Sequence, residues 1–343
     1  MGQALADPSW SWSQQLTALA NLTFEASVKR AERIRSEASV TCLAFGDISE
    51  DDAKRLARTL SAVVIAKPTE TPHLQGIVAL PKQTAFTEMR SKALVENESN
   101  SLAMLIYQLD PVQCARDRPL CPDSMKQAAT MLLLSQVASQ RAFNQLRTKE
   151  SLGYVVWLWP QPSPVEEAGG KVVWSLRLLV QSTVKSASYV RQRMNLFMAA
   201  LLDDFSSNEL KTTGRRLGSS LSISESDIEL AKHGLIASLL KRPDSLADEG
   251  FRLWQEILLR REDWSRPWEL ADVVMQLSRE DCRQVLQQAL HPGGSSRKAA
   301  IEVWRSEDGS PFTNPDVLNL QDGIAMAEWK RTSGDWAKVV DTV

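Results

Sequence analysis

The chain has 343 residues, a formal net charge of −2, and ordinary shares of hydrophobic (43%) and charged (24%) residues. It is long enough to bury a substantial core, and its charge gives no reason to expect a nucleic acid or an anionic membrane surface as a partner. No apolar run is long enough to span a bilayer, so no membrane partner is expected.

The N-terminus and the cysteines predict a cytoplasmic or other intracellular protein that is not secreted. The first residues lack the basic and apolar regions of a secretory signal. Cys42, Cys114, Cys121 and Cys282 show neither a CxxC pair nor the spacing of a disulfide framework. Reduced thiols are therefore expected.

Residues 1–70 predict helices around a single strand. Capping boxes that begin at Ser11 and Ser49 indicate helix starts, and VTCLAFGDI at 40–48 predicts a short strand. One strand cannot form a sheet, so this region is expected to be the incomplete C-terminal part of a preceding α+β domain. The Pro- and Thr-rich stretch 66–76 predicts a linker.

Beyond the linker, the pattern changes from strands to helices. Strands are expected at 77–81, 101–110, 154–159, 171–182 and 300–304. A long helix is expected over 122–147, and helices dominate from about 187 to 290. Strands followed by a run of helices predict an α+β fold, a mostly antiparallel sheet with helices packed on it. This domain is expected to cover 71–308, followed by a polar tail at 309–343.

The histidines argue against a metal site on this chain. His73, His233 and His291 are scattered, and none belongs to HxxEH or HExxH. A helix-borne catalytic zinc needs two histidines on one helical face and a carboxylate. The chain also lacks a GxSxG elbow, a Walker A loop and a GxGxxG turn after a strand. Composition and motifs alone therefore predict a soluble α+β protein without assigned chemistry.

One stretch carries more information: residues 143–156, with the sequence FNQLRTKESLGYVV, where the long helix meets a strand. RTKE-x-LGY, with Phe143 four residues ahead of Arg147, resembles the C-terminal half of the insulin-degrading enzyme, nardilysin and pitrilysin family of zinc metallopeptidases. Further segments resemble the same family in order, among them QLTALANLTFEASVKRAERIRSEASVTCLAFGDIS, ENESNSLAMLIYQLD and KRPDSLADEGFRLWQEI. The resemblance runs from about residue 12 to about residue 304.

The resemblance implies an architecture and a set of partners. Family members have four homologous α+β domains in two halves around a degradation chamber, and only the N-terminal half carries the zinc motif. This chain resembles the end of the third domain and the whole fourth domain. The implied partners are a peptide substrate and a catalytic N-terminal half, encoded in the same gene or as a separate chain. Zinc is expected in that missing half, and no cofactor in this one.

The resemblance also assigns roles to three residues. Arg147 resembles the arginine that contacts the substrate backbone near the scissile bond, and its donor fork suits peptide carbonyls. Tyr154 resembles the tyrosine that steadies the tetrahedral intermediate, which a neutral hydroxyl can do by donating to an oxyanion. Phe143 resembles an aromatic residue of the pocket beside the cleavage point. Gly153 is expected to let the chain reverse and bring Tyr154 back beside the helix.

An ordinary structural interpretation stays open for each residue. A cation in the last helical turn is favoured by the helix dipole, a strand-initial tyrosine is commonly half-buried with a wet hydroxyl, and a phenylalanine can simply pack. The chain also departs from the family pattern. Ser151 replaces a glutamine, and 206–222 holds an insertion between two helices, expected as a surface loop or an extra helical turn.

Two functions compete. The first is the zinc-less C-terminal half of a zinc metalloendopeptidase, which lacks HxxEH and is not active alone. The second is a non-enzymatic peptide-binding or scaffold protein that retains the fold. Retention of Arg147 and Tyr154 favours the first, because a scaffold has no need of an oxyanion donor. The start within a domain favours a truncated chain.

Overall fold

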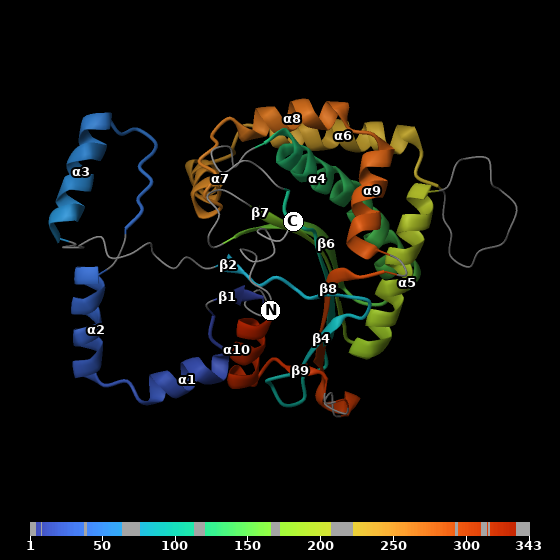
Figure 1. Ribbon diagram of the computed structural model, residues 1–343, viewed down its shortest axis with the longest axis horizontal. Helices are drawn as coiled ribbons and strands as arrows, with labels where there is room; N and C mark the ends of the chain where they lie inside the picture. The colour runs from blue at the N-terminus through green and yellow to red at the C-terminus, as the bar shows by residue number, and fades with distance from the viewer. Residues whose placement is uncertain are drawn as a thin grey trace, which may run out of the picture.

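The structure is a computed structural model that describes residues 5–7, 9–37, 40–63, 76–112, 121–165, 172–206, 222–291, 294–309, 314 and 316–333. Its centre is a seven-stranded sheet with a thick layer of helices on one face and a thinner layer on the other (Figure 1). The predicted insertion at 206–222 lies, apart from its two end residues, outside the described residues.

The sheet is mostly antiparallel, as predicted. Its strand order is β6-β7-β5-β8-β4-β9, and β3 also pairs with β8. Among the described strands, parallel pairing is confined to β4, which pairs with β8 and with β9. The strands are β3 (Lys82–Gln83), β4 (Thr87–Lys92), β5 (Ser101–Gln108), β6 (Val155–Pro164), β7 (Val172–Ser182), β8 (Ser296–Trp304) and β9 (Leu318–Asn319). A separate antiparallel pair joins β1 (Ala6–Asp7) and β2 (Gly76–Ile77).

The thick layer holds the main core. Its helices are α4 (Pro122–Ala142), α5 (Ala187–Ser206), α6 (Glu225–Leu239), α8 (Arg266–Gln276) and α9 (Arg279–Leu290). Helix α7 (Leu246–Leu258) contributes none of its residues to this core. Alternate residues of the strands, such as Leu105, Leu176 and Leu178, bury one sheet face against Leu134 of α4 and Met194 of α5. Each fully buried side chain of this size contributes about 1.5–3 kcal/mol. This packing fixes α4 along the sheet and thereby the position of its C-terminal end.

The thinner layer includes residues that the sequence predicted to be a polar tail. After the short 3₁₀ turn Ser306–Asp308, the strand β9 pairs with β4, and helix α10 (Gly323–Thr332) follows. Met326 of α10 is buried with Met104, Ile106 and Ile301 on the second sheet face. The described part of this segment therefore belongs to the domain. Its sequence signal is weak because only a few of its residues are apolar.

The N-terminal helices are α1 (Trp12–Ala20), α2 (Phe24–Glu37) and α3 (Glu50–Val63), and they lie to one side of the sheet (Figure 1). Helix α2 has no buried residue. The strand predicted at 40–48 is wrong, because these residues have no strand conformation and none of the described strands pairs with them. The Phe45 ring lies instead against Gly250 of α7.

The cysteine prediction is partly wrong. Cys121, which precedes α4, is disulfide-bonded, whereas Cys42 and Cys282 are free. Spacing alone did not reveal this bond, and it removes the support that uniformly reduced thiols gave to an intracellular location. Within the described ranges, none of the helices is long and apolar enough to cross a bilayer.

Candidate functional site

The long helix does not stay α-helical to its end. After Ala142 the chain continues as a π-helix, η1 (Phe143–Lys149). Its last turn closes with hydrogen bonds from Glu150 N–H to the Gln145 carbonyl (3.0 Å) and from Leu152 N–H to the Leu146 carbonyl (2.9 Å). Single turns of π-helix are rare and occur frequently at functional sites. The sequence predicted an ordinary α-helix here.

The structure brings together the three residues that the sequence singled out. The Arg147 Cζ lies 4.7 Å from the Phe143 ring centroid and 4.5 Å from the Tyr154 ring centroid. The guanidinium is therefore within cation–π distance of both rings, which is worth about 0.5–1 kcal/mol each at exposed sites. Phe143 is 41% exposed and Tyr154 is 79% exposed. We call these three residues the aromatic stack.

The stack leaves its polar atoms unused. Among the described residues, neither the Arg147 guanidinium nor the Tyr154 hydroxyl makes a hydrogen bond or an ion pair with a protein group. An arginine on a protein surface commonly finds a carboxylate, and here two rings hold it instead. The stack therefore presents oriented N–H and O–H donors to whatever binds beside it.

The turn after η1 differs from the sequence interpretation. The residue with a positive φ is Ser151 (50°), so Ser151 and not Gly153 makes the left-handed reversal. Gly153 is needed for a different reason: a Cβ there would lie 1.8 Å from the Gln181 carbonyl oxygen and 3.2 Å from the Ser182 Cα. Only glycine permits this approach of β6 to β7. The approach fixes Tyr154, the next residue, at the start of the strand.

Glu150 anchors the same turn to the helical layer. Its carboxylate accepts two hydrogen bonds from the Arg193 guanidinium of α5 (2.7 and 3.0 Å) and one from Gln145 Nε2 (2.7 Å). Burial raises the pKa of Glu150, but the hydrogen bonds from Arg193 and Gln145 lower it by more, so the net pKa is lowered. Sequence reasoning assigned Glu150 no role, although it stands inside the RTKE-x-LGY motif.

A groove of about 970 Å³ begins at the stack and follows β6. One wall is the C-terminal part of α4 and η1, and the other carries Trp157, Trp159 and Arg177. Phe143 belongs to both the stack and the groove. The stack thus lies at one end of a surface long enough for an extended ligand.

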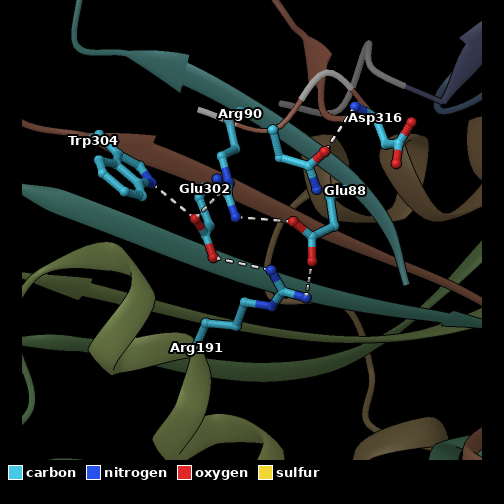
Figure 2. Close-up of polar contacts among 7 residues, drawn as sticks. Glu88, Arg90, Arg191, Glu302, Trp304 and Asp316 are labelled. Atoms are coloured by element: carbon cyan, nitrogen blue, oxygen red, sulfur yellow. Dashed lines mark hydrogen bonds and ion pairs between the residues drawn. The ribbon is translucent and has the colours of Figure 1, made fainter. Parts of the chain in front are cut away.

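A second polar cluster lies inside the domain (Figure 2). Arg191 of α5 bridges Glu88 (2.8 Å) and Glu302 (3.2 Å), and Arg90 contacts the same two carboxylates at 2.9 and 3.1 Å. The Trp304 indole donates to Glu302 at 2.8 Å. Burial raises the pKa of Glu88, but Arg191 and Arg90 lower it by more. Both carboxylates are paired with cations, so this cluster ties β4, β8 and α5 together and leaves nothing aimed at a ligand.

The comparisons with known proteins agree with the fold. Residues 133–254, which contain the stack and all of the groove residues except Met104, match the family model described as PQQ synthase PqqF-like, C-terminal lobe domain 4. A nardilysin-like protein of Arabidopsis thaliana is 23% identical over 346 residues, covering 96% of this chain and 30% of the relative. The insulin-degrading enzyme of Drosophila melanogaster is 21% identical over 323 residues, covering 92% and 30%. The crystal structure of pitrilysin matches with a TM-score of 0.72 at 17% identity, covering 97% of this chain and 31% of pitrilysin.

The chain is related to the insulin-degrading enzyme, nardilysin and pitrilysin family. It resembles the C-terminal half of these peptidases and spans 30% of the length of each of the two curated relatives named above. Another relative of similar coverage is the putative zinc protease mug138 of Schizosaccharomyces pombe, 25% identical over 292 residues, covering 83% of this chain and 26% of the relative. Pitrilysin, at its low identity, supports the fold alone.

The described part of the chain contains no group of three His, Cys, Asp or Glu residues that could hold a metal ion. His233 lies on α6, and His291 caps α9 in a left-handed conformation. His73 lies outside the described residues.

Proposed function

We propose that this chain is the C-terminal, zinc-less half of an insulin-degrading-enzyme-like zinc metalloendopeptidase. It contributes peptide binding and transition-state contacts to a catalytic half, which carries the zinc and is either part of the same gene product or a separate chain. The observation that supports the proposal most is the aromatic stack, whose Arg147 and Tyr154 donors are held in place and left without protein acceptors within the described ranges. Residues 1–70 complete a preceding domain in this arrangement.

Each member of the stack has a chemical role in the proposal. Arg147 donates to a carbonyl of the bound peptide near the scissile bond, and the two rings limit the rotamers its fork can adopt. Tyr154 donates its hydroxyl proton to the oxyanion that forms when that carbonyl becomes tetrahedral. Phe143 offers an apolar face to the side chain next to the cleavage point. Because the oxyanion exists only in the transition state, Tyr154 should affect turnover more than binding.

The test compares Tyr154→Phe with Tyr189→Phe in an assembly that contains the catalytic half. Tyr189 is 43% exposed on α5, with the Lys185 Nζ 5.4 Å from its ring centroid, and is a matched tyrosine outside the stack. Tyr154→Phe keeps the ring that stacks on Arg147 but loses the hydroxyl. We expect kcat to fall by about 10²–10³ with KM little changed, and Tyr189→Phe to match the parent.

Arg147→Ala is expected to raise KM and lower kcat together, because Arg147 contacts the ground state as well. If Tyr154→Phe cleaved peptide at the parental rate with an unchanged melting temperature, the transition-state role would be wrong. The alternative function, a peptide-binding scaffold that retains the peptidase fold, would then be favoured.

A further inference from the structure

Strand β6 is the last strand on one side of the sheet. Within the described residues β6 pairs with β7 alone, so its other edge is not hydrogen-bonded to a second strand, although β2 contacts β6. A free edge offers a row of N–H and C=O groups to any extended chain. The groove runs along this edge, with residues of α4 on one side and residues of the opposite sheet face on the other.

Three prolines divide this edge into two parts. Pro160, Pro162 and Pro164 occupy alternate positions of β6, and the register with β7 continues past them all. Proline has no N–H, so a paired strand tolerates it where the nitrogen points away from its partner. The three nitrogens therefore face the free edge. By the same alternation, Val156 and Leu158 direct their N–H and C=O groups to that edge, next to the aromatic stack.

A partly buried cation of β7 lies beside the open part of the edge. Arg177 lies opposite Trp159 across the β6–β7 pair, on the same sheet face, and lines the groove. Its Nε donates to the Ser175 hydroxyl at 3.2 Å, and in the described ranges it has no carboxylate partner. Burial lowers the pKa of Arg177 to about 10. A carboxylate brought into the groove would supply the missing partner, and in a partly buried place such a pair is stronger than on the surface.

We propose that the open part of β6, from Val155 to Trp159, binds an extended peptide segment as an additional strand, with an acidic side chain of the peptide on Arg177. This proposal rests on the proposed function, because the segment is the continuation of the substrate that Arg147 and Tyr154 contact. Continuity supports a substrate segment over a second copy of this chain, since Phe143 lines both the groove and the stack. Pro160 marks where strand pairing stops.

The first test uses this chain alone and a short fluorescein-labelled peptide of alternating Thr and Val with one central Glu. The Glu sets the register on Arg177. Two further peptides carry N-methyl groups on alternate backbone nitrogens. In one peptide the methyl groups lie on one edge of the extended chain, and in the other peptide they lie on the opposite edge. Because only one edge of the peptide can pair with β6, one N-methylated peptide should bind about tenfold or more weakly and the other about as well as the parent. Equal affinities for the two N-methylated peptides, or no saturable binding up to about 1 mM peptide, would overturn the proposal.

The second test asks whether Arg177 selects the acidic side chain. Arg177→Met is expected to abolish an about tenfold preference for the Glu peptide over its Gln counterpart. The matched control is Lys298→Met, because Lys298 is another partly buried cation of the sheet whose pKa burial lowers, and it does not line the groove. A Glu preference that survives in Arg177→Met would refute the assignment of Arg177.

The outcomes separate this proposal from the proposed function. Binding to the isolated chain reports on β6, whereas loss of turnover in Tyr154→Phe reports on the stack. If Tyr154→Phe lost turnover but the two N-methylated peptides bound with equal affinity, the peptidase role would stand and strand addition to β6 would be rejected. A dimer that forms with rising protein concentration and excludes the peptide would also reject it, because β6 would then pair with a second copy.

Discussion

Gly153→Ala adds one methyl group where β6 meets β7, and the structure makes its cost large. The new Cβ would lie 1.8 Å from the Gln181 carbonyl oxygen and 2.8 Å from its carbonyl carbon. Carbon and carbonyl oxygen normally approach no closer than about 3.3 Å, so the two strands must separate by roughly 1.5 Å. Overpacking costs about 1–3 kcal/mol, and one or two lost ladder hydrogen bonds add about 0.5–1.5 kcal/mol each. We expect a total loss of about 1.5–6 kcal/mol.

The matched control is Gly234→Ala, which adds the same methyl group on the exposed side of α6. Its Cβ would meet only Gln136 Nε2, at an ordinary 3.6 Å. Alanine in a helix interior should raise the free energy of unfolding by about 0.5–1 kcal/mol. Urea unfolding followed by circular dichroism measures both variants, which should shift in opposite directions. If Gly153→Ala unfolded at the parental urea concentration, the close approach of β6 to β7 would be refuted.

Three further predictions concern charge and exposure. Glu150→Gln should lower the free energy of unfolding by about 1–3 kcal/mol at pH 7. Because the folded-state pKa of Glu150 is lowered, its contribution to stability is lost as pH falls through that pKa. Urea unfolding curves of the parent and of Glu150→Gln should therefore converge in acid. Burial raises the pKa of Asp204 from 3.8 to about 6, and the nearby Arg141 only partly offsets this, so the free energy of unfolding should fall as pH rises from about 4 to 6. Asp204→Asn should remove this fall and raise the free energy of unfolding by about 1 kcal/mol at pH 7, after allowance for solvent screening. An unchanged dependence of stability on pH in Asp204→Asn would contradict this. Helix α2, without a buried residue, should exchange its amide protons faster than β5 and β7 in hydrogen-exchange mass spectrometry, and equal protection in a monomer would contradict this.

Elements in which apolar residues recur at a regular spacing were predictable from the sequence. The alternation of apolar residues predicted β7 at 171–182, and the structure has it at Val172–Ser182. The sequence also predicted that helices dominate from about 187 to 290, where the structure has α5 to α9. Strand β4, by contrast, was missed because its sequence TEMRSK is mostly polar. Its Glu88 and Arg90 point into the charged cluster with Arg191, so their partners, which are distant in sequence, make the strand stable.

The candidate site was predictable in its membership but only partly in its geometry. A resemblance drew attention to Phe143, Arg147 and Tyr154, and the structure places them in one stack. The π-helix was not predicted, because a single turn is too short to set up a repeat of apolar residues that the sequence could reveal. Gly153 was noticed for its freedom of rotation, but its contact with β7 depends on a strand pairing that only the fold defines.

The alternate prolines of β6 also bear on solubility. An unprotected edge strand can pair with the same strand of another molecule and start aggregation. The segments that stack into amyloid-like zippers are about six or seven residues long and contain no proline. Pro160 and Pro162 keep the open stretch of β6 shorter than this. We therefore expect that replacing both prolines with valine would lengthen the open edge and make the chain more prone to form fibrils on storage.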